Sequence, residues 1–183
     1  MSTCGNSYGQ GRRTRRNLLM QAVVALGSGR VLHAAVDAST WRAYQAVEES
    51  WIRDRHELLI QEAPTVILAA EIDLEVRLAD LRKRAIEFEH VASRDSSLLN
   101  GGVWQMTSLP LSAQCRKELN RLPQYRRIIA QLTQLTDSLR RHPQYPYLQH
   151  AQMRLWKTPQ YVEAHRRYTG RMQELQRTCI ADR

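Results

Sequence analysis

An all-α protein is predicted, with four or five amphipathic helices packed in an irregular bundle. Several stretches repeat apolar residues every three to four positions, which is the spacing of one helix face. Strands have no support, because no short stretch alternates apolar and polar side chains between hairpin turns. The 183 residues, 43% of them hydrophobic, suffice to bury the core of a single domain without disulfides or metals.

Residues 1–30 are expected to form a flexible basic arm or a targeting-like segment ahead of a single helical domain, residues 31–183. Gly, Ser, Asn and Gln dominate the beginning of this arm. A short one-faced apolar pattern then follows a basic cluster, which consists of Arg12, Arg13, Arg15 and Arg16. An acid-free, amphipathic start of this kind is typical of mitochondrial targeting segments, and a basic arm that lies on a partner is the alternative.

Two helices are predicted next, near residues 41–62 and 65–92, and Pro64 ends the first. The second has the longest apolar stripe in the chain, with Leu78 and Leu81 at its middle, so we expect it to be the central element. Two acid-before-base pairs on this helix are expected on its solvated face, where each contributes a few tenths of a kcal/mol. These pairs are Asp73 with Arg77 and Asp80 with Arg84.

Residues 93–111 are predicted to form a long central loop, because they contain an Asn-Gly-Gly run, Pro110 and several serines. A loop of this length in a small domain usually has a function or belongs to an interface. Trp104 and Met106 lie in its middle and follow no helical period. We therefore expect these two side chains to be anchors that bind a partner.

Three more helices are predicted near residues 112–121, 123–141 and 159–178. The triplet Pro-Gln-Tyr occurs three times in this half of the chain. Proline in the first turn of a helix gives up no hydrogen bond, so we interpret the triplet as repeated helix-start chemistry. Ahead of the last helix Pro143 and Pro146 are expected to break the chain, leaving only a short turn of helix through Leu155 and Trp156.

No complete catalytic or metal-binding motif is present in the sequence, so neither an enzyme nor a cofactor is expected. His56 and Glu57 begin like a zinc motif, but Ile60 holds the position of the second histidine. Glu87 and His90 match one half of a di-iron pair that has no second copy, and both are expected on a solvated face. The three cysteines are widely spaced, which argues against a disulfide framework and favours a reducing compartment.

The net charge of +9 is unevenly distributed, because two basic ends flank an acidic middle. Cations neutralise phosphates and flat rings stack on unpaired bases, so the basic C-terminal half is a candidate surface for RNA or DNA. The rings that lie among its cations are Tyr125, Tyr145, Tyr147, Trp156, Tyr161 and Tyr168. The candidate contacts are Arg116, Lys117, Arg126, Arg127, Arg140, Arg141, Trp156, Arg166, Arg167 and Arg171.

The leading expectation is a non-catalytic accessory subunit that stabilises a large assembly and has other protein subunits as its partners. A mitochondrial respiratory complex or ribosome is the expected setting, and the cytoplasm is the alternative location. Helical nucleic-acid binding is the alternative function; under the subunit hypothesis the rings pack between helices and the arginines are solvated or contact acidic partners. No apolar run approaches the roughly 20 residues that cross a bilayer.

Overall fold

The computed structural model describes residues 38–94, 109 and 111–181, with residues 38 and 179–181 described by their backbone alone. The described residues all belong to one of two units of the chain, His33–Arg183, and the other unit is Met1–Leu32. Within the described part there are six α-helices, one 3-10 turn and no strand. The all-α prediction is therefore confirmed, with one helix more than the predicted four or five.

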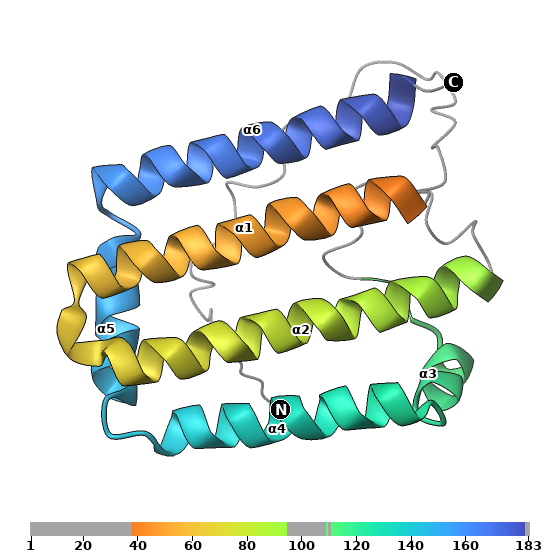
Figure 1. Ribbon diagram of the computed structural model, residues 1–183, viewed down its shortest axis with the longest axis horizontal. Coiled ribbons are helices and arrows are strands. Elements are labelled where there is room, and N and C mark those ends of the chain that lie inside the picture. Colours follow the sequence, from red (N-terminus) through yellow and green to blue (C-terminus); the bar gives the residue numbers. More distant parts are fainter. Residues whose placement is uncertain (1–37, 95–108, 110, 182–183) are drawn as a thin grey trace, which may run out of the picture. The chain divides into compact units, whose positions relative to one another are not determined.

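Two long helices, α1 (Ala38–Glu62) and α2 (Ile67–Arg94), form an antiparallel pair (Figure 1). The short 3-10 turn η1 (Pro64–Val66) joins them, and Pro64 occupies its first turn. Proline favours this position because the missing N–H would have no partner there. Both helices match the predicted ranges closely, except that α2 continues for two residues into the segment predicted as the central loop.

The C-terminal half contains α3 (Ala113–Leu119), α4 (Pro123–Arg141), α5 (Tyr145–Leu155) and α6 (Pro159–Ala181). Pro123 begins α4 and Pro159 begins α6, as the interpretation of the repeated triplet predicts. The middle triplet differs, because Pro143 precedes α5 and the proline in the first turn of that helix is Pro146. Ser112 caps α3, since its Oγ accepts the Cys115 N–H at 3.0 Å, and the Thr158 hydroxyl accepts the Tyr161 N–H at 3.2 Å.

The prediction of a mere turn of helix before α6 was wrong. Pro143 and Pro146 do not break up this segment, because one precedes α5 and the other lies in its first turn. A first-turn proline costs no hydrogen bond, so the helix runs on to Leu155. Trp156 follows as the C-cap residue.

Four helices lie side by side in one layer, in the order α6, α1, α2, α4 (Figure 1). The fifth, α5, crosses one end of this layer and packs against α1, α2 and α4. Helix α3 packs against α2 near the other end. Because α2 has neighbours on both sides and is crossed by α5, the prediction that it is the central element is confirmed.

Three groups of buried side chains hold the layer together. The first lies between α1, α2 and α6, where the Trp41 ring stacks on Phe88 with centroids 4.3 Å apart, and Leu78, Leu81 and Met172 complete it. The second lies under α5, and the third joins α2 to α3 and α4. Burying one such large side chain stabilises the fold by about 1.5 to 3 kcal/mol. Buried apolar side chains therefore hold each pair of neighbouring helices in the layer together.

A polar network crosses the seams between α1, α2 and α6. Arg84 on α2 donates to the Tyr44 hydroxyl at 2.8 Å and lies 3.5 Å from the Glu48 carboxylate and 3.3 Å from Asp80. Tyr168 on α6 donates to the other Glu48 oxygen at 2.7 Å. The Arg84 side chain is only 13% exposed, so the prediction that its pair with Asp80 lies on a solvated face was wrong. It faces α1 because Glu48 and Tyr44 supply partners there.

Glu87 and His90 also point inward, contrary to the sequence prediction. Glu87 is buried and accepts a hydrogen bond from the Tyr125 hydroxyl at 2.7 Å, while Lys83 approaches it to 3.6 Å. The His90 side chain is nearly buried and lies 3.3 Å from Glu118 on α3. These contacts connect α2 to α3 and α4, which gives the two polar side chains a structural reason to leave the solvent.

Candidate interaction surfaces

The described part of the chain contains no group of three or more His, Cys, Asp or Glu side chains placed to hold a metal ion. None of its helices is long and apolar enough to cross a membrane. Its larger hollows are open depressions at the surface, one of them about 390 Å³ between α1 and α6. The candidate sites are therefore exposed surfaces, namely the outer sides of α5 and of α4.

The first is the outer side of α5. Leu148, Ala151 and Leu155 recur at helical spacing and are each 1% exposed, because they pack on the layer. Three large apolar side chains of α5 and its C-terminal end remain in solvent: Tyr147 is 69% exposed, Met153 49% and Trp156 52%. We call the exposed set Tyr147, His150, Met153, Arg154, Trp156 and Lys157 the α5 surface.

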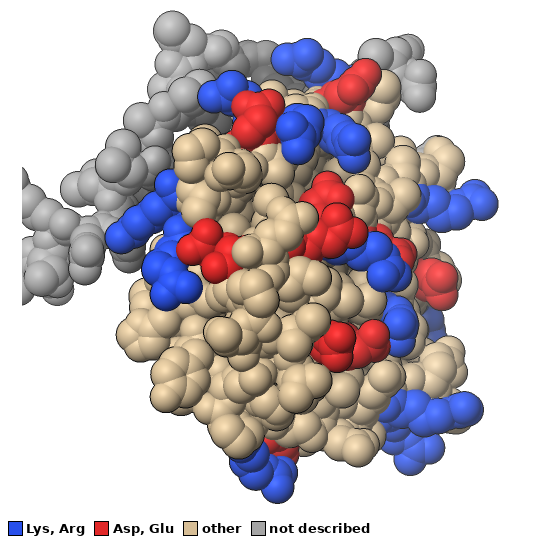
Figure 2. Space-filling model, turned by 60° about the vertical axis from the view of Figure 1, so that its left-hand side comes forward, with Lys and Arg blue, Asp and Glu red and all other residues tan. Residues whose placement is uncertain are grey.

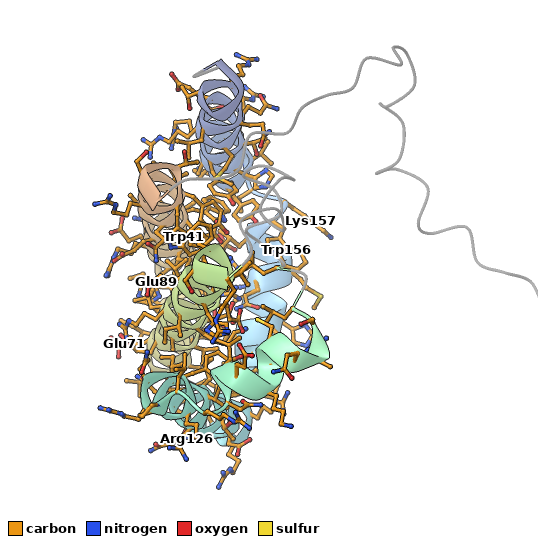
Figure 3. All side chains as sticks on the ribbon, turned by 90° about the vertical axis from the view of Figure 1, so that its right-hand side faces the viewer. Trp41, Glu71, Glu89, Arg126, Trp156 and Lys157 are labelled. Carbon is orange, nitrogen blue, oxygen red and sulfur yellow. The ribbon has the colours of Figure 1, made fainter. Side chains whose placement is uncertain are left out.

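The segment that forms α5 carries no acidic side chain, and the carboxylate that approaches it from α1 is Glu62, 3.4 Å from Arg154. No Asp or Glu occurs in residues 138–162, whereas Arg154 and Lys157 lie among the apolar side chains. Figure 3 places Trp156 and Lys157 on the side of the layer that bears α5, and Glu71 and Glu89 on the opposite side. Figure 2 views the end where α1 turns into α2. Much of the surface there is uncharged, several Asp and Glu side chains lie within it, and Lys and Arg lie mostly toward its margins.

Contacts with the layer hold α5 in place. The Gln152 amide donates to Asp73 on α2 at 3.1 Å, and the Gln144 side-chain oxygen accepts the backbone N–H of Ala69 at 3.2 Å. At the outer side Arg154 Nε lies 3.4 Å from Glu62, a half-exposed pair that contributes little to stability. The exposed rings of the α5 surface are therefore carried on a fixed backbone.

The second surface is the outer side of α4. The predicted nucleic-acid contacts are not one surface, since α4 and α6 occupy opposite edges of the layer (Figure 1). Arg116 and Lys117 lie on α3, and Trp156 belongs to the α5 surface. The remaining residues divide between α4, with Arg126, Arg127, Arg140 and Arg141, and α6, with Arg166, Arg167 and Arg171.

The arginines of the two edges also differ in their partners. On α6, Arg166 and Arg167 lie 3.1 and 3.8 Å from Glu163. On α4, Arg141 lies 3.8 Å from Asp137, and the other three arginines of the helix form no ion pair with any described residue. Three arginines of α4 therefore have no acidic partner among the described residues, whereas Arg166 and Arg167 of α6 share Glu163.

Most rings that were expected among these cations serve the core instead. Tyr125 is buried against Glu87, and burial together with that hydrogen bond raises the pKa of its hydroxyl. Tyr161 and Tyr168 pack on Trp51 of α1 with centroids 5.4 and 5.1 Å apart. Tyr145 is half-buried, so Tyr147 and Trp156 are the exposed rings of the set, both on the α5 surface.

The candidate partner contacts Arg12, Arg13, Arg15, Arg16, Trp104 and Met106 lie outside the described residues. Sequence reasoning missed the α5 surface as a unit, because the two prolines were interpreted as breaks. The spacing of Leu148, Ala151 and Leu155 was the available signal, since it defines a buried face and leaves Tyr147 and Met153 outside it.

Comparisons of the chain with protein-family models, with curated proteins and with solved structures find no match.

Proposed function

We propose that the protein is a non-catalytic helical subunit that stabilises a larger protein assembly, and that the α5 surface docks it onto a neighbouring protein. The observation that carries this proposal is the exposure of Tyr147, Met153 and Trp156 on a helix whose other side is fully packed. Tyr, Trp, Met and Arg are enriched at protein interfaces, and a few such side chains supply most of the binding energy.

The charge of the α5 surface defines the partner. Arg154 and Lys157 lie among the apolar side chains; Arg154 is approached by Glu62 at 3.4 Å, whereas Lys157 forms no ion pair with any described residue. A partner with an apolar pocket and an acidic side chain facing Lys157 is therefore complementary. The fixed backbone of α5 lowers the entropy lost on binding, because the rings are already held in position by the helix. These properties support a stable docking site.

Native mass spectrometry of the protein purified from its own source tests the proposal. We expect a stoichiometric complex with at least one other protein, which the Trp156→Ala variant loses while its melting temperature stays unchanged. Leu68→Ala is the matched control, because Leu68 is 56% exposed on α2 and lies outside the α5 surface. Recovery of the wild-type protein as a free monomer, or equal loss of the complex in both variants, contradicts the proposal.

The proposed setting is a mitochondrial assembly such as a respiratory complex or a ribosome, with the cytoplasm as the alternative. Its support is the acid-free, arginine-bearing composition of residues 1–30. A fluorescent reporter that carries these residues is expected to enter mitochondria, and replacement of Arg12, Arg13, Arg15 and Arg16 by Glu is expected to abolish entry. A reporter that stays in the cytoplasm contradicts the mitochondrial setting and leaves the docking proposal standing.

A further inference from the structure

The outer side of α4 faces away from the layer, and no described helix covers it. Its inner side carries Tyr125, Ile128 and Leu139, which are buried against the neighbouring helices. Because α4 occupies the edge of the layer next to α2, the opposite side of the helix remains in solvent (Figure 1). Figure 3 shows Arg126 at this edge, directed away from the layer.

Two pairs of arginines lie at the two ends of this outer side. Arg126 and Arg127 are near the start of α4, and Arg140 and Arg141 end it. The pairs are fourteen positions apart, which is close to four helical turns, so they project toward the same side about 21 Å apart. All four side chains are exposed.

A shallow open depression lies along this side of α4. It is lined by the uncharged side chains of Ala130, Thr133, Gln134 and Ser138 and by the carboxylate of Asp137, and it extends past Arg141 to Pro143. The one carboxylate on α4, Asp137, lies 3.8 Å from Arg141. This depression leaves room for a bulky ligand to lie along the helix between the arginines, and its hydroxyl and amide groups are able to hydrogen-bond to that ligand.

The surroundings add further positive charge. Residues 113–157 contain nine Lys and Arg side chains and two carboxylates. The second carboxylate, Glu118, is already engaged by Arg94 at 3.4 Å and by the Gln114 amide at 2.8 Å. Lys117 and Arg121, just before α4, form no ion pair with any described residue. An anionic ligand therefore meets a net positive charge here, and the one acid within the depression, Asp137, lies 3.8 Å from Arg141.

We propose that the outer side of α4 binds the phosphate backbone of double-helical nucleic acid. The guanidinium group forms paired hydrogen bonds to phosphate oxygens, and the positive end of the α4 dipole lies near Arg126. The major groove of a B-form duplex is about 12 Å wide, so a span of about 21 Å reaches a phosphate strand on each side. This role goes beyond docking to a protein and uses a separate surface.

Two features of this surface select a duplex over other polyanions. Single strands bind by stacking bases on aromatic rings, and the one ring on α4, Tyr125, is buried. Anionic membranes bind helices that insert a broad apolar face, whereas Ile129 is the one large exposed apolar side chain of α4. Backbone contact with a duplex needs neither rings nor apolar insertion.

Fluorescence anisotropy of the full chain with labelled 24-mer DNA and RNA, each as duplex and as single strand, tests this inference at several salt concentrations. The variants are Arg126→Gln with Arg127→Gln, and Arg140→Gln with Arg141→Gln. The control is Arg166→Gln with Arg167→Gln on α6, which removes the same charge from helix positions that already have an acidic partner. Circular dichroism establishes that every variant keeps its helix content.

We expect duplex binding whose logarithmic salt slope falls by about two in each α4 variant, with little change in the control. Raising the salt from 50 to 200 mM then weakens binding by a factor that is about ten times smaller in each α4 variant than in the wild-type protein. Because the spacing argument applies to a B-form groove, we expect duplex DNA to bind more tightly than A-form duplex RNA. The inference is overturned if no duplex binds at low salt, if the α6 control falls equally, or if the α4 arginines matter only for single strands. Binding of anionic vesicles that depends on the same α4 arginines also overturns it.

Discussion

Arg84 shows how a charged side chain is tolerated inside this layer. It contacts Tyr44, Glu48 and Asp80, and Tyr168 supplies Glu48 with a further hydrogen bond. The network joins α1, α2 and α6, three of the four helices of the layer. Such a cluster stabilises only when it is complete, because removing one member leaves the others buried without partners.

We therefore expect Arg84→Ala to lower the free energy of unfolding by about 2 to 3 kcal/mol. Arg82→Ala is the matched control, since Arg82 is exposed on the same helix, and a surface change of this kind alters stability by no more than about 0.5 kcal/mol. Urea unfolding followed by circular dichroism measures both values. Equal effects of the two substitutions contradict the structural role assigned to Arg84.

Tyr44 makes the stability of the same network depend on alkaline pH. Burial is the main reason that the pKa of its hydroxyl rises to about 12, and nearby Arg84 partly opposes that rise. An unfolded tyrosine titrates near pH 10, so the stability that depends on the protonated hydroxyl is complete below pH 10 and is lost as pH rises toward 12.

Urea unfolding between pH 8 and pH 11.5 is expected to show this decline in the wild-type protein and a shallower one in Tyr44→Phe, which has no hydroxyl to ionise. The comparison separates Tyr44 from the other groups that titrate in this range, because only Tyr44 differs between the two proteins. Parallel stability curves for the two proteins contradict the burial of a protonated hydroxyl at this position.

At the scale of elements, α5 shows what sequence reasoning achieved and where it stopped. The ranges of α1, α2, α4 and α6 were predictable because long apolar stripes define them without any tertiary contact. Proline disrupts the interior of a helix but is harmless at its start. Helix α5 was missed because spacing alone did not show which of these two cases applied to Pro143 and Pro146. Glu87 was misplaced because only Tyr125, 38 residues away, explains its burial.

Truncating two neighbouring residues at the end of α5 is expected to change the stability of the fold by very different amounts. Leu155 is 1% exposed and packs under the helix, so Leu155→Ala should cost about 2 to 5 kcal/mol through lost burial and a residual cavity. Trp156 is 52% exposed, and Trp156→Ala should change stability by no more than about 0.5 kcal/mol. Thermal unfolding of the isolated chain compares them, and a larger loss for Trp156→Ala contradicts the orientation of α5.

Gly170 offers a test of α6 in the stabilising direction. It lies inside the helix, and a Cβ added there meets no atom within 4 Å. Glycine in a helix interior costs about 0.5 to 1 kcal/mol relative to alanine because it loses more backbone entropy on folding. Gly170→Ala is therefore expected to raise the melting temperature, and a lowered melting temperature contradicts the solvent-facing placement of this position.

At the scale of the whole described unit, the single layer determines which surfaces are available. Helices in a layer bury one or two sides and leave the rest in solvent, so α4 and α6 each retain an open edge. The order α6, α1, α2, α4 was beyond sequence reasoning, because periodicity identifies an apolar stripe without identifying its partner. That order separates the α4 arginines from those of α6 and leaves Tyr147, Met153 and Trp156 uncovered on α5.

The docking proposal requires that another protein covers the α5 surface in the native assembly. Photo-crosslinking in cells of the source organism tests it most directly, with benzoylphenylalanine in place of Met153 on the α5 surface or in place of Glu71 on the opposite side of the layer (Figure 3). We expect one defined crosslinked protein from position 153, which is absent from position 71 and is lost when Trp156→Ala is added. A chain that remains uncrosslinked at position 153, or the same products from both positions, contradicts it.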